Sequence, residues 1–236
     1  MNMNTKNLLK PLLLLPLLCV PQLAYSQDNH LSETEKQAGW SLLFNGKDMS
    51  QWRSFKQDSV NKQWQVKDGA MVLTQKGGGD LISKKCYKNF DLMLEWNVSL
   101  AGNSGVFVMA DESGDYIYSH APEIQIIDNE RHPDTKIDSH LSGSIYDLVT
   151  SPADAHKPAG QWNQVRIQLL NNHLNVWQNN VLTADILIDG DKWKQLVQKS
   201  KFKNWKNFTT NDGCQIGLQD HDGDVVAFKN IKIKAL

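Results

Sequence analysis

From Trp40 to the C-terminus, the chain alternates between short apolar runs and turn-forming pairs of residues. About a dozen such runs are separated by pairs such as Asp68-Gly69, Asn171-Asn172, Asn179-Asn180 and Asp222-Gly223. Residues of these types adopt the positive φ angles that tight hairpins require. Many short strands at regular spacing are typical of an all-β sandwich or barrel, so we expect an all-β fold.

Several runs show the period-two alternation of a strand with one buried face. In Phe90–Val98 the even-numbered positions are apolar and most odd-numbered positions are polar, and Val225–Ile233 ends in the same pattern. Ile145–Val149 is a further apolar run that we expect to form a strand. Because successive side chains of a strand point to opposite faces, such strands can cover a core with one side.

Two short segments depart from the β pattern and predict helices. Ser32-Glu33-Thr34-Glu35 is a capping-box sequence, which predicts one or two helical turns within Leu31–Ala38. Trp193, Leu196 and Val197 have the i, i+3, i+4 spacing of a short amphipathic helix. The sequence therefore predicts an all-β domain with a short N-terminal helix and one short helical insertion.

The first 26 residues have the pattern of a secretory signal peptide. Lys6 and Lys10 precede an apolar run at Leu12–Val20, and Ala24-Tyr25-Ser26 carries small residues at the two positions that a signal peptidase reads. The apolar run is too short to cross a hydrocarbon core of ~30 Å, so we expect no membrane insertion. We expect cleavage near Ser26 and export to the periplasm or the medium.

Removal of this leader leaves 210 residues, a length that suits one domain with a sizeable core. We expect residues 27–38 to form an N-terminal segment and residues 39–236 to form that domain. The 210 residues include 23 basic and 26 acidic groups, which argues against nucleic acid as a partner because nucleic acid requires a basic face. Cys86 and Cys214 remain, and after export they form either one disulfide or two buried thiols.

The first candidate site is the strand that begins at Glu123. Glu123 and Gln125 share one face of this strand, while Ile124 and Ile126 point to the other. If the other face packs on the core, this carboxylate and amide can line a concave site. An ordinary exposed strand with a salt-bridging glutamate would show the same sequence pattern. Asp128 falls on the opposite face unless a β-bulge shifts the register.

The second candidate site is the turn that follows an apolar run at Ile216–Leu218. The hairpin at Asp222-Gly223 raises His221 to the rim of the sheet, and imidazole groups titrate near neutral pH, which suits them to proton transfer. The neighbouring acidic residues Asp220 and Asp224 could hold a cation through oxygen ligands, but the segment does not match the full calcium-binding loop. An ordinary polar turn is the alternative.

Five further residues are weaker candidates for binding a polar ligand. Asn103 offers an amide, Lys157 a cation, and Trp162 and Tyr146 aromatic rings, while His132 lies in the loop after the Glu123 strand. Each is also consistent with ordinary loop structure. The sequence contains no phosphate-binding loop, Gly-x-Ser-x-Gly, His-Glu-x-x-His or paired Cys-x-x-Cys motif.

Six segments, taken together and in order, resemble the 3-keto-disaccharide hydrolase domain family. The segments are Gly39–Trp52, Asn103–Phe107, Glu123–Gln125, Lys157–Asn163, Ser200–Lys203 and Gly217–His221. The resemblance spans about residues 39–235. It implies a concanavalin-like jelly-roll sandwich, export to the periplasm, and action on glycosides that are oxidised to a ketone at C3.

This resemblance implies a reaction that the candidate residues can perform. A ketone at C3 acidifies the C2 proton, so a base can remove it, the C1 leaving group departs by elimination, and water then adds to the enone. We hypothesise that Glu123 and His221 share the proton transfers, with the individual assignment open. The candidates for binding the sugar or polarising the ketone are Gln125, Asn103, Lys157, Trp162 and Tyr146. The one cofactor that the reaction could use is a divalent cation, which would act as an electrophile. Its candidate ligands are Asp128, His132 and Asp220.

A conventional glucanase is one alternative. Glu123, Gln125 and Asp128 have the spacing of the bulged Glu-x-Asp-x-x-Glu strand of laminarinase-type enzymes. The middle acid is replaced by an amide and the third carboxylate is shorter, whereas a retaining mechanism requires two carboxyl groups ~5–5.5 Å apart.

A carbohydrate-binding module without catalytic activity is the other alternative. Jelly-roll sandwiches include many lectins, and a fold does not determine function. Trp52, Trp162 and Trp177 could stack on sugar faces, although most of the eight tryptophans suit a core.

Overall fold

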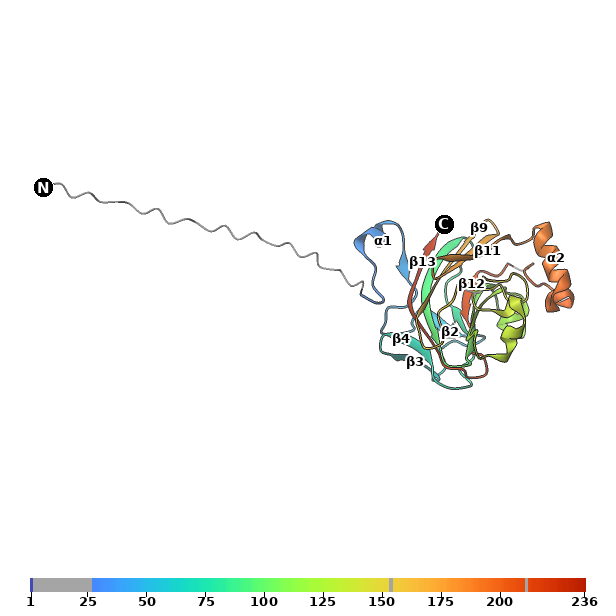
Figure 1. Ribbon diagram of the computed structural model, residues 1–236, viewed down its shortest axis with the longest axis horizontal. Helices are drawn as coiled ribbons and strands as arrows, with labels where there is room; N and C mark the ends of the chain where they lie inside the picture. The colour runs from blue at the N-terminus through green and yellow to red at the C-terminus, as the bar shows by residue number, and fades with distance from the viewer. Residues whose placement is uncertain (2–26, 153–154, 211) are drawn as a thin grey trace.

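The computed structural model describes residues 1, 27–152, 155–210 and 212–236. Two antiparallel sheets pack against each other as a β-sandwich, which confirms the expected jelly-roll fold (Figure 1). The larger sheet has the strand order β11-β10-β9-β6-β13-β4-β3, with β1 paired to β13. The smaller sheet has the order β2-β5-β12-β7-β8.

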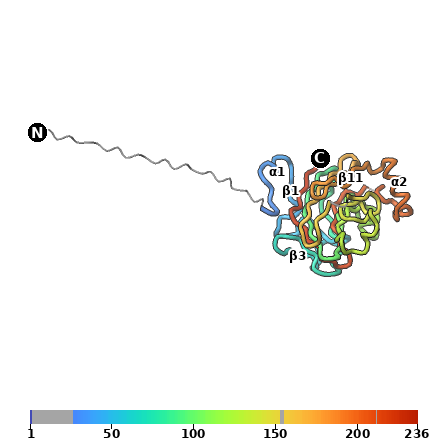
Figure 2. Tube along the Cα trace, viewed as in Figure 1, coloured from blue at the N-terminus to red at the C-terminus, as the bar shows by residue number. Residues whose placement is uncertain are grey.

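The strands of the larger sheet are β1 (Ser41–Leu42), β3 (Trp64–Lys67), β4 (Ala70–Leu73), β6 (Phe90–Val98), β9 (Asn163–Leu170), β10 (His173–Gln178), β11 (Val181–Leu187) and β13 (Val226–Ala235). Those of the smaller sheet are β2 (Trp52–Ser54), β5 (Leu81–Ser83), β7 (Asn103–Ala110), β8 (Glu123–Ile127) and β12 (Gln215–Leu218). The blue N-terminal part of the chain lies beside the red C-terminal strand because β1 pairs with β13 (Figure 2).

The core forms where the apolar faces of the two sheets meet. Phe90, Leu92, Leu94 and Trp96 of β6 are each at most 1% exposed, which confirms the alternation expected for this strand. Burial of each such large side chain contributes about 1.5–3 kcal/mol to the free energy of unfolding. Asp91 is also buried, and Arg166 compensates its charge by binding both carboxylate oxygens, at 2.6 and 2.8 Å.

Both expected helices are present. The helix α1 (Glu33–Gln37) begins at Ser32, whose hydroxyl accepts a hydrogen bond from the Glu35 amide while the Glu35 carboxylate accepts one from the Ser32 amide. The helix α2 (Asp191–Lys199) buries Trp193 and lies at the opposite end of the molecule from α1 (Figure 1). The described residues also form the short 3₁₀ turns η1 (Ile117–Ser119), η2 (Pro133–Lys136), η3 (Asp138–His140) and η4 (Lys201–Asn204).

The expectation of a strand at Ile145–Val149 is wrong. Ile145 forms only isolated bridges, to Ile124 and to Val149. Asp147 has a φ angle of 58°, so the chain reverses direction there and the amides of Ile145 and Val149 bond to each other's carbonyls. This turn, and not a strand, carries Tyr146.

Cys86 and Cys214 form a disulfide with their Cα atoms 4.9 Å apart, which resolves the alternative that the sequence left open. The predicted signal peptide falls on residues 2–26 and so lies outside the described residues. Within the described part of the chain, no helix has the length and apolar character that crossing a membrane requires.

Candidate active site

A cavity of about 540 Å³ opens on the outer face of the smaller sheet, over β7 and β8. Its walls come from η2, η4, the turn that carries Tyr146 and the residues that follow β12. Its lining residues are Asn103, Tyr118, Ala121, Glu123, Gln125, His132, Pro133, Asp134, Tyr146, Lys201, Phe202, Trp205, Gln219 and His221.

Glu123 reaches this cavity because the strand alternation holds. Ile124 and Ile126 are 1% exposed in the core, so Glu123 and Gln125 face the other way. Gly105 on β7 leaves room for the carboxyl group, since an added Cβ there would collide with Glu123 Oε1. With the Gln125 amide oriented by its neighbours, its nitrogen donates to Glu123 Oε1 at 3.2 Å.

The surroundings of Glu123 disfavour a negative charge. Burial raises the pKa of Glu123 to about 8, and the nearby acidic groups Asp80 and Asp134 act in the same direction. The ammonium of Lys201 opposes this effect without cancelling it. Below about pH 8 the carboxyl group is therefore mostly protonated, which makes it a proton donor.

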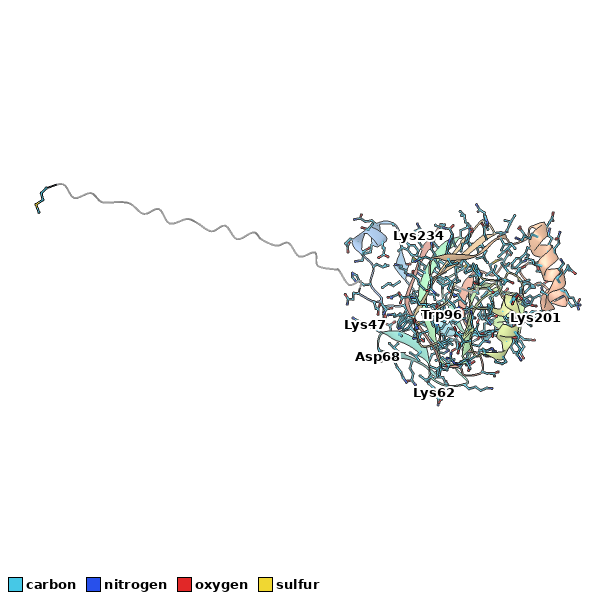
Figure 3. The ribbon with its side chains drawn as sticks, in the orientation of Figure 1. Lys47, Lys62, Asp68, Trp96, Lys201 and Lys234 are labelled. Carbon is cyan, nitrogen blue, oxygen red and sulfur yellow. A yellow bond between two sulfur atoms is a disulfide. The ribbon has the colours of Figure 1, made fainter. Side chains whose placement is uncertain are left out.

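Lys201 at the start of η4 places a cation beside the buried carboxyl group. Its backbone amide donates to Asp147 Oδ2 at 2.7 Å, which fixes the start of the turn. Its ammonium lies 4.1 Å from the centre of the Tyr146 ring. Burial lowers the pKa of Lys201, and the acidic groups around it, Glu123 among them, raise it again. Figure 3 shows Lys201 near α2, away from Lys47 and Lys62.

Tyr146 forms a rigid wall of the cavity. Its hydroxyl donates to Asp134 Oδ2 at 3.0 Å, and its ring stacks on His140 with ring centres 4.1 Å apart. The two nitrogens of His140 lie 3.0 Å from Asp134 and 3.3 Å from Asp147. Burial and the Asp134 carboxylate raise the pKa of Tyr146, so this phenol remains a neutral donor.

A second group of titratable side chains lies at the rim. The rings of His132 and His221 meet edge to face with centres 5.9 Å apart. Asp224 lies 3.3 Å from His221 Nδ1 and also accepts from the Asn103 amide. One ligand atom each from His132, His221 and Asp224 lie within 4.8 Å of one another, the only such group of three among the described residues. Two imidazoles and a carboxylate are a donor set that suits a divalent transition metal.

Residues 39–234 match the family model of the 3-keto-alpha-glucoside-1,2-lyase-like domain. The chain belongs to this family. A 3-keto-disaccharide hydrolase from Bacteroides thetaiotaomicron is 34% identical over 229 residues, which are 84% of this chain and 79% of that relative.

Solved structures give the same result. A candidate glycosyl hydrolase from Parabacteroides distasonis matches with a TM-score of 0.82 and 30% identity over 89% of this chain and 100% of its own. A second from the same organism matches with a TM-score of 0.68 and 25% identity, over 84% of this chain and 99% of its own. Together with the family match, these similarities support a carbohydrate-processing hydrolase.

Six of the residues selected from the sequence of this family member line the cavity. They come from β7, β8, the Tyr146 turn, the start of η2 and the turn after β12. They are Glu123, His221, Gln125, Asn103, Tyr146 and His132.

Lys157 and Trp162 do not reach this cavity. They precede β9, which belongs to the larger sheet. The Lys157 ammonium donates to the Trp162 carbonyl at 3.2 Å, and the Trp162 ring lies 4.6 Å from the ammonium of Lys229. Their expected contact with a ligand in this cavity therefore has no geometric support.

Asp128 and Asp220 are also outside the group that could bind a metal, because backbone amides occupy their carboxylates. Asp128 accepts from the amides of Ala101 and Glu130, and the β7–β8 register continues without a bulge. Asp220 accepts from the amides of Gly79 and Gly223.

Sequence reasoning missed Lys201, Asp224 as a partner of His221, and the rings of Tyr118 and Trp205. Lys201 and Trp205 follow α2 in an irregular segment, where no periodic pattern predicts which way a side chain points. The resemblance did include Ser200–Lys203, and that segment was the one signal that could have directed attention to Lys201.

Proposed function

We propose that this cavity cleaves glycosides that are oxidised to a ketone at C3, by removing the C2 proton and eliminating the C1 substituent. One observation carries the proposal: Glu123, Lys201 and His221 line the same cavity, and its volume of about 540 Å³ suits a single sugar unit. A protonated carboxyl, a cation and an imidazole are the acid, the electrophile and the base that such an elimination requires.

In the first half of the proposed reaction, His221 acts as the base. The Asp224 carboxylate favours the Nδ1–H tautomer of His221 and leaves Nε2 to take the C2 proton. The electrons of the C2–H bond form an enolate, whose charge on the C3 oxygen is stabilised by the Lys201 ammonium. The C1–O bond then breaks, a C1=C2 double bond forms, the ketone returns, and Glu123 protonates the departing oxygen.

The second half of the reaction restores both groups. The Glu123 carboxylate takes a proton from water as the water oxygen adds to C1, and His221, which is partly exposed at the rim and exchanges its abstracted proton with solvent, delivers a solvent proton to C2. The sum is hydrolysis of the glycosidic bond. The buried Gln219 side-chain oxygen, which has no hydrogen-bond partner among the described residues, is an available acceptor for a sugar hydroxyl.

The two alternatives receive less support. A laminarinase-type mechanism would require Asp128 beside Glu123, and the Asp128 carboxylate is instead bound to backbone amides. A lectin would not require a carboxyl with a strongly raised pKa beside a cation. Of the tryptophans expected to serve a lectin, Trp52 is 1% exposed and Trp177 lies beneath Arg166 on the larger sheet.

The alternative role of His221 is metal binding, in which His132, His221 and Asp224, in place of Asp128 and Asp220, would hold a divalent cation. A bound cation supplies a Lewis acid that polarises a ketone oxygen. Chelation decides the role of His221. Full activity after treatment with EDTA assigns His221 as the base, whereas loss of activity that Mn²⁺ or Zn²⁺ restores makes His221 a ligand.

The experiment that tests the proposed function offers the purified protein a 3-keto-glucoside and the unoxidised parent. We expect cleavage of the oxidised compound alone. Glu123→Gln and His221→Ala should each lower turnover by about 100-fold or more. Lys157→Ala is the matched control because it removes a charged side chain outside the cavity. Near-wild-type rates in both active-site variants, or saturable binding without cleavage, would refute the assignment.

We also propose that the protein is exported and that residues 1–26 are removed near Ser26. The Cys86–Cys214 disulfide supports an oxidising compartment. N-terminal sequencing of the protein recovered from the periplasm or the medium should read from Gln27, and an uncleaved cytoplasmic protein would contradict this.

A further inference from the structure

A second hollow of about 400 Å³ adjoins the candidate active site. It is lined by Tyr116, Tyr118, Ser119, Trp205 and Lys206. Tyr118 and Trp205 also line the first cavity, so the two hollows adjoin at these rings. We call Tyr116, Tyr118 and Trp205 the aromatic shelf.

The two tyrosines of the aromatic shelf are exposed, Trp205 is half-buried, and all three rings are held in place. Tyr116 is 59% exposed and stacks on Tyr118 with ring centres 5.1 Å apart and planes 3° from parallel. Trp205 meets Phe202 and Phe208 edge to face, at 4.9 and 6.3 Å. Exposed large rings fixed by their neighbours are typical of a binding surface, because little conformational entropy is lost when a ligand stacks on them.

Two loops build the aromatic shelf and are tied to each other. The loop with the tyrosines follows β7, and the loop with Trp205 follows α2. The Thr209 amide donates to the His120 carbonyl at 2.9 Å, and the Cys214 amide donates to the Ala110 carbonyl at 3.0 Å. The shelf therefore has a defined position relative to the cavity that holds Glu123.

We propose that the aromatic shelf is the subsite for the leaving group of the glycoside and that it favours an aryl ring over a second sugar. The inference rests on the proposed function, in which the bond to C1 breaks in the adjoining cavity. The leaving group must extend out of that cavity, and two rings of the shelf, Tyr118 and Trp205, also line it. An uncovered aromatic face of this shelf matches the face of a flat ring.

The preference for an aryl ring follows from the few polar groups of this hollow. A sugar carries hydroxyl groups around its whole rim, and each needs a partner when it loses water. Apart from the tyrosine hydroxyls and the indole N–H of Trp205, the polar side chains of the lining are Lys206 and Ser119, and the Ser119 hydroxyl already accepts from the Tyr116 amide at 3.3 Å. An aryl ring has no hydroxyl groups that need hydrogen-bond partners.

The test compares 3-keto-glucosides whose leaving groups differ in shape but little in basicity: methyl, cyclohexylmethyl and benzyl, with a glucosyl compound as a fourth. We expect kcat/KM for the benzyl compound to exceed that for the methyl compound by about 5- to 20-fold, with the other two between them. Tyr116→Ala should reduce this ratio severalfold, while Tyr116→Phe should retain it. A wild-type ratio near one, an unchanged ratio in Tyr116→Ala, or a preference for the glucosyl compound overturns the inference.

These outcomes are distinct from failure of the proposed function. If the wild-type protein cleaves none of the four compounds, the proposed function fails, and calorimetry with benzyl and methyl glucosides still tests the aromatic shelf. Tighter binding of the benzyl compound that depends on Tyr116 supports the shelf as a ring-binding subsite. Equal affinity for the two compounds contradicts it.

Discussion

Replacement of Glu123 by glutamine should stabilise the protein, and the gain should increase with pH. The buried carboxyl group has a pKa of about 8 in the folded protein, compared with 4.5 for an ordinary glutamate. Folding therefore favours its protonated form. Below pH 4.5 Glu123 is protonated in both states and does not make the free energy of unfolding depend on pH. Between pH 4.5 and 8 the free energy of unfolding falls, and this penalty grows with pH because the carboxyl group ionises in the unfolded chain but not in the folded one.

The size of this effect follows from the shift of the pKa. At about 1.4 kcal/mol per pKa unit, the penalty is about 1 kcal/mol at pH 5 and approaches about 5 kcal/mol above pH 8. Glutamine has nearly the same shape and carries no charge at any pH, so Glu123→Gln should avoid the penalty. For a chain of this size, the melting temperature should rise by about 2 °C at pH 5 and about 10 °C at pH 9.

The assay is thermal unfolding of the wild-type protein and the variant in matched buffers from pH 5 to pH 9. Glu112→Gln is the control with the opposite sign. Hydrogen bonds from Arg53 lower the pKa of Glu112, so its carboxylate stabilises the fold above the ordinary pKa of glutamate and this contribution is lost as the pH falls. If Glu123→Gln melts at or below the wild-type temperature at pH 9, the pKa of Glu123 is not raised in the folded protein, and its carboxyl group cannot be the acid proposed here.

Of three further predictions, two concern neighbours of this carboxyl group and one concerns the disulfide. Gly105→Ala should displace the Glu123 side chain and lower kcat by about 10-fold or more while the protein stays folded by circular dichroism, because the new methyl group collides with a movable side chain and not with backbone; unchanged kcat would contradict the close packing. Lys201→Met should lower kcat by about 100-fold. It should also move the alkaline limb of the kcat/KM pH profile to higher pH, because the Lys201 ammonium of the wild-type protein lowers the pKa of Glu123; a shift to lower pH would be inconsistent with a cation beside Glu123. Replacing Cys86 and Cys214 by serine should lower the free energy of unfolding by about 3–5 kcal/mol in urea titrations, because the disulfide closes a long loop; equal stability would contradict a formed disulfide.

The sequence predicted those features of the fold that depend on local patterns. Alternation along Phe90–Val98 and the strand at Glu123 gave the correct buried faces, and the spacing of Trp193, Leu196 and Val197 gave the correct helix. The same reasoning wrongly predicted a strand at Ile145–Val149, because an apolar run does not show that Asp147 has a positive φ angle.

The assembly of the site depends on strand order, which no local pattern encodes. Glu123 and His221 approach each other because β8 pairs with β7 and β7 with β12. Lys157 was expected to bind substrate, yet it precedes a strand of the other sheet. Lys201 was missed because its position depends on a turn that Asp147 holds from a distant part of the chain.

The central claim is that bond cleavage begins with removal of the C2 proton, and a 3-keto-glucoside carrying deuterium at C2 tests it directly. We predict that the enzyme slows with this compound, that its deuterium passes to water during cleavage, and that Glu123→Gln and His221→Ala lose this release together with turnover. A reaction without protein corrects for spontaneous exchange beside the ketone. Cleavage that leaves the deuterium on C2, or equal cleavage of the unoxidised glucoside, would contradict the account.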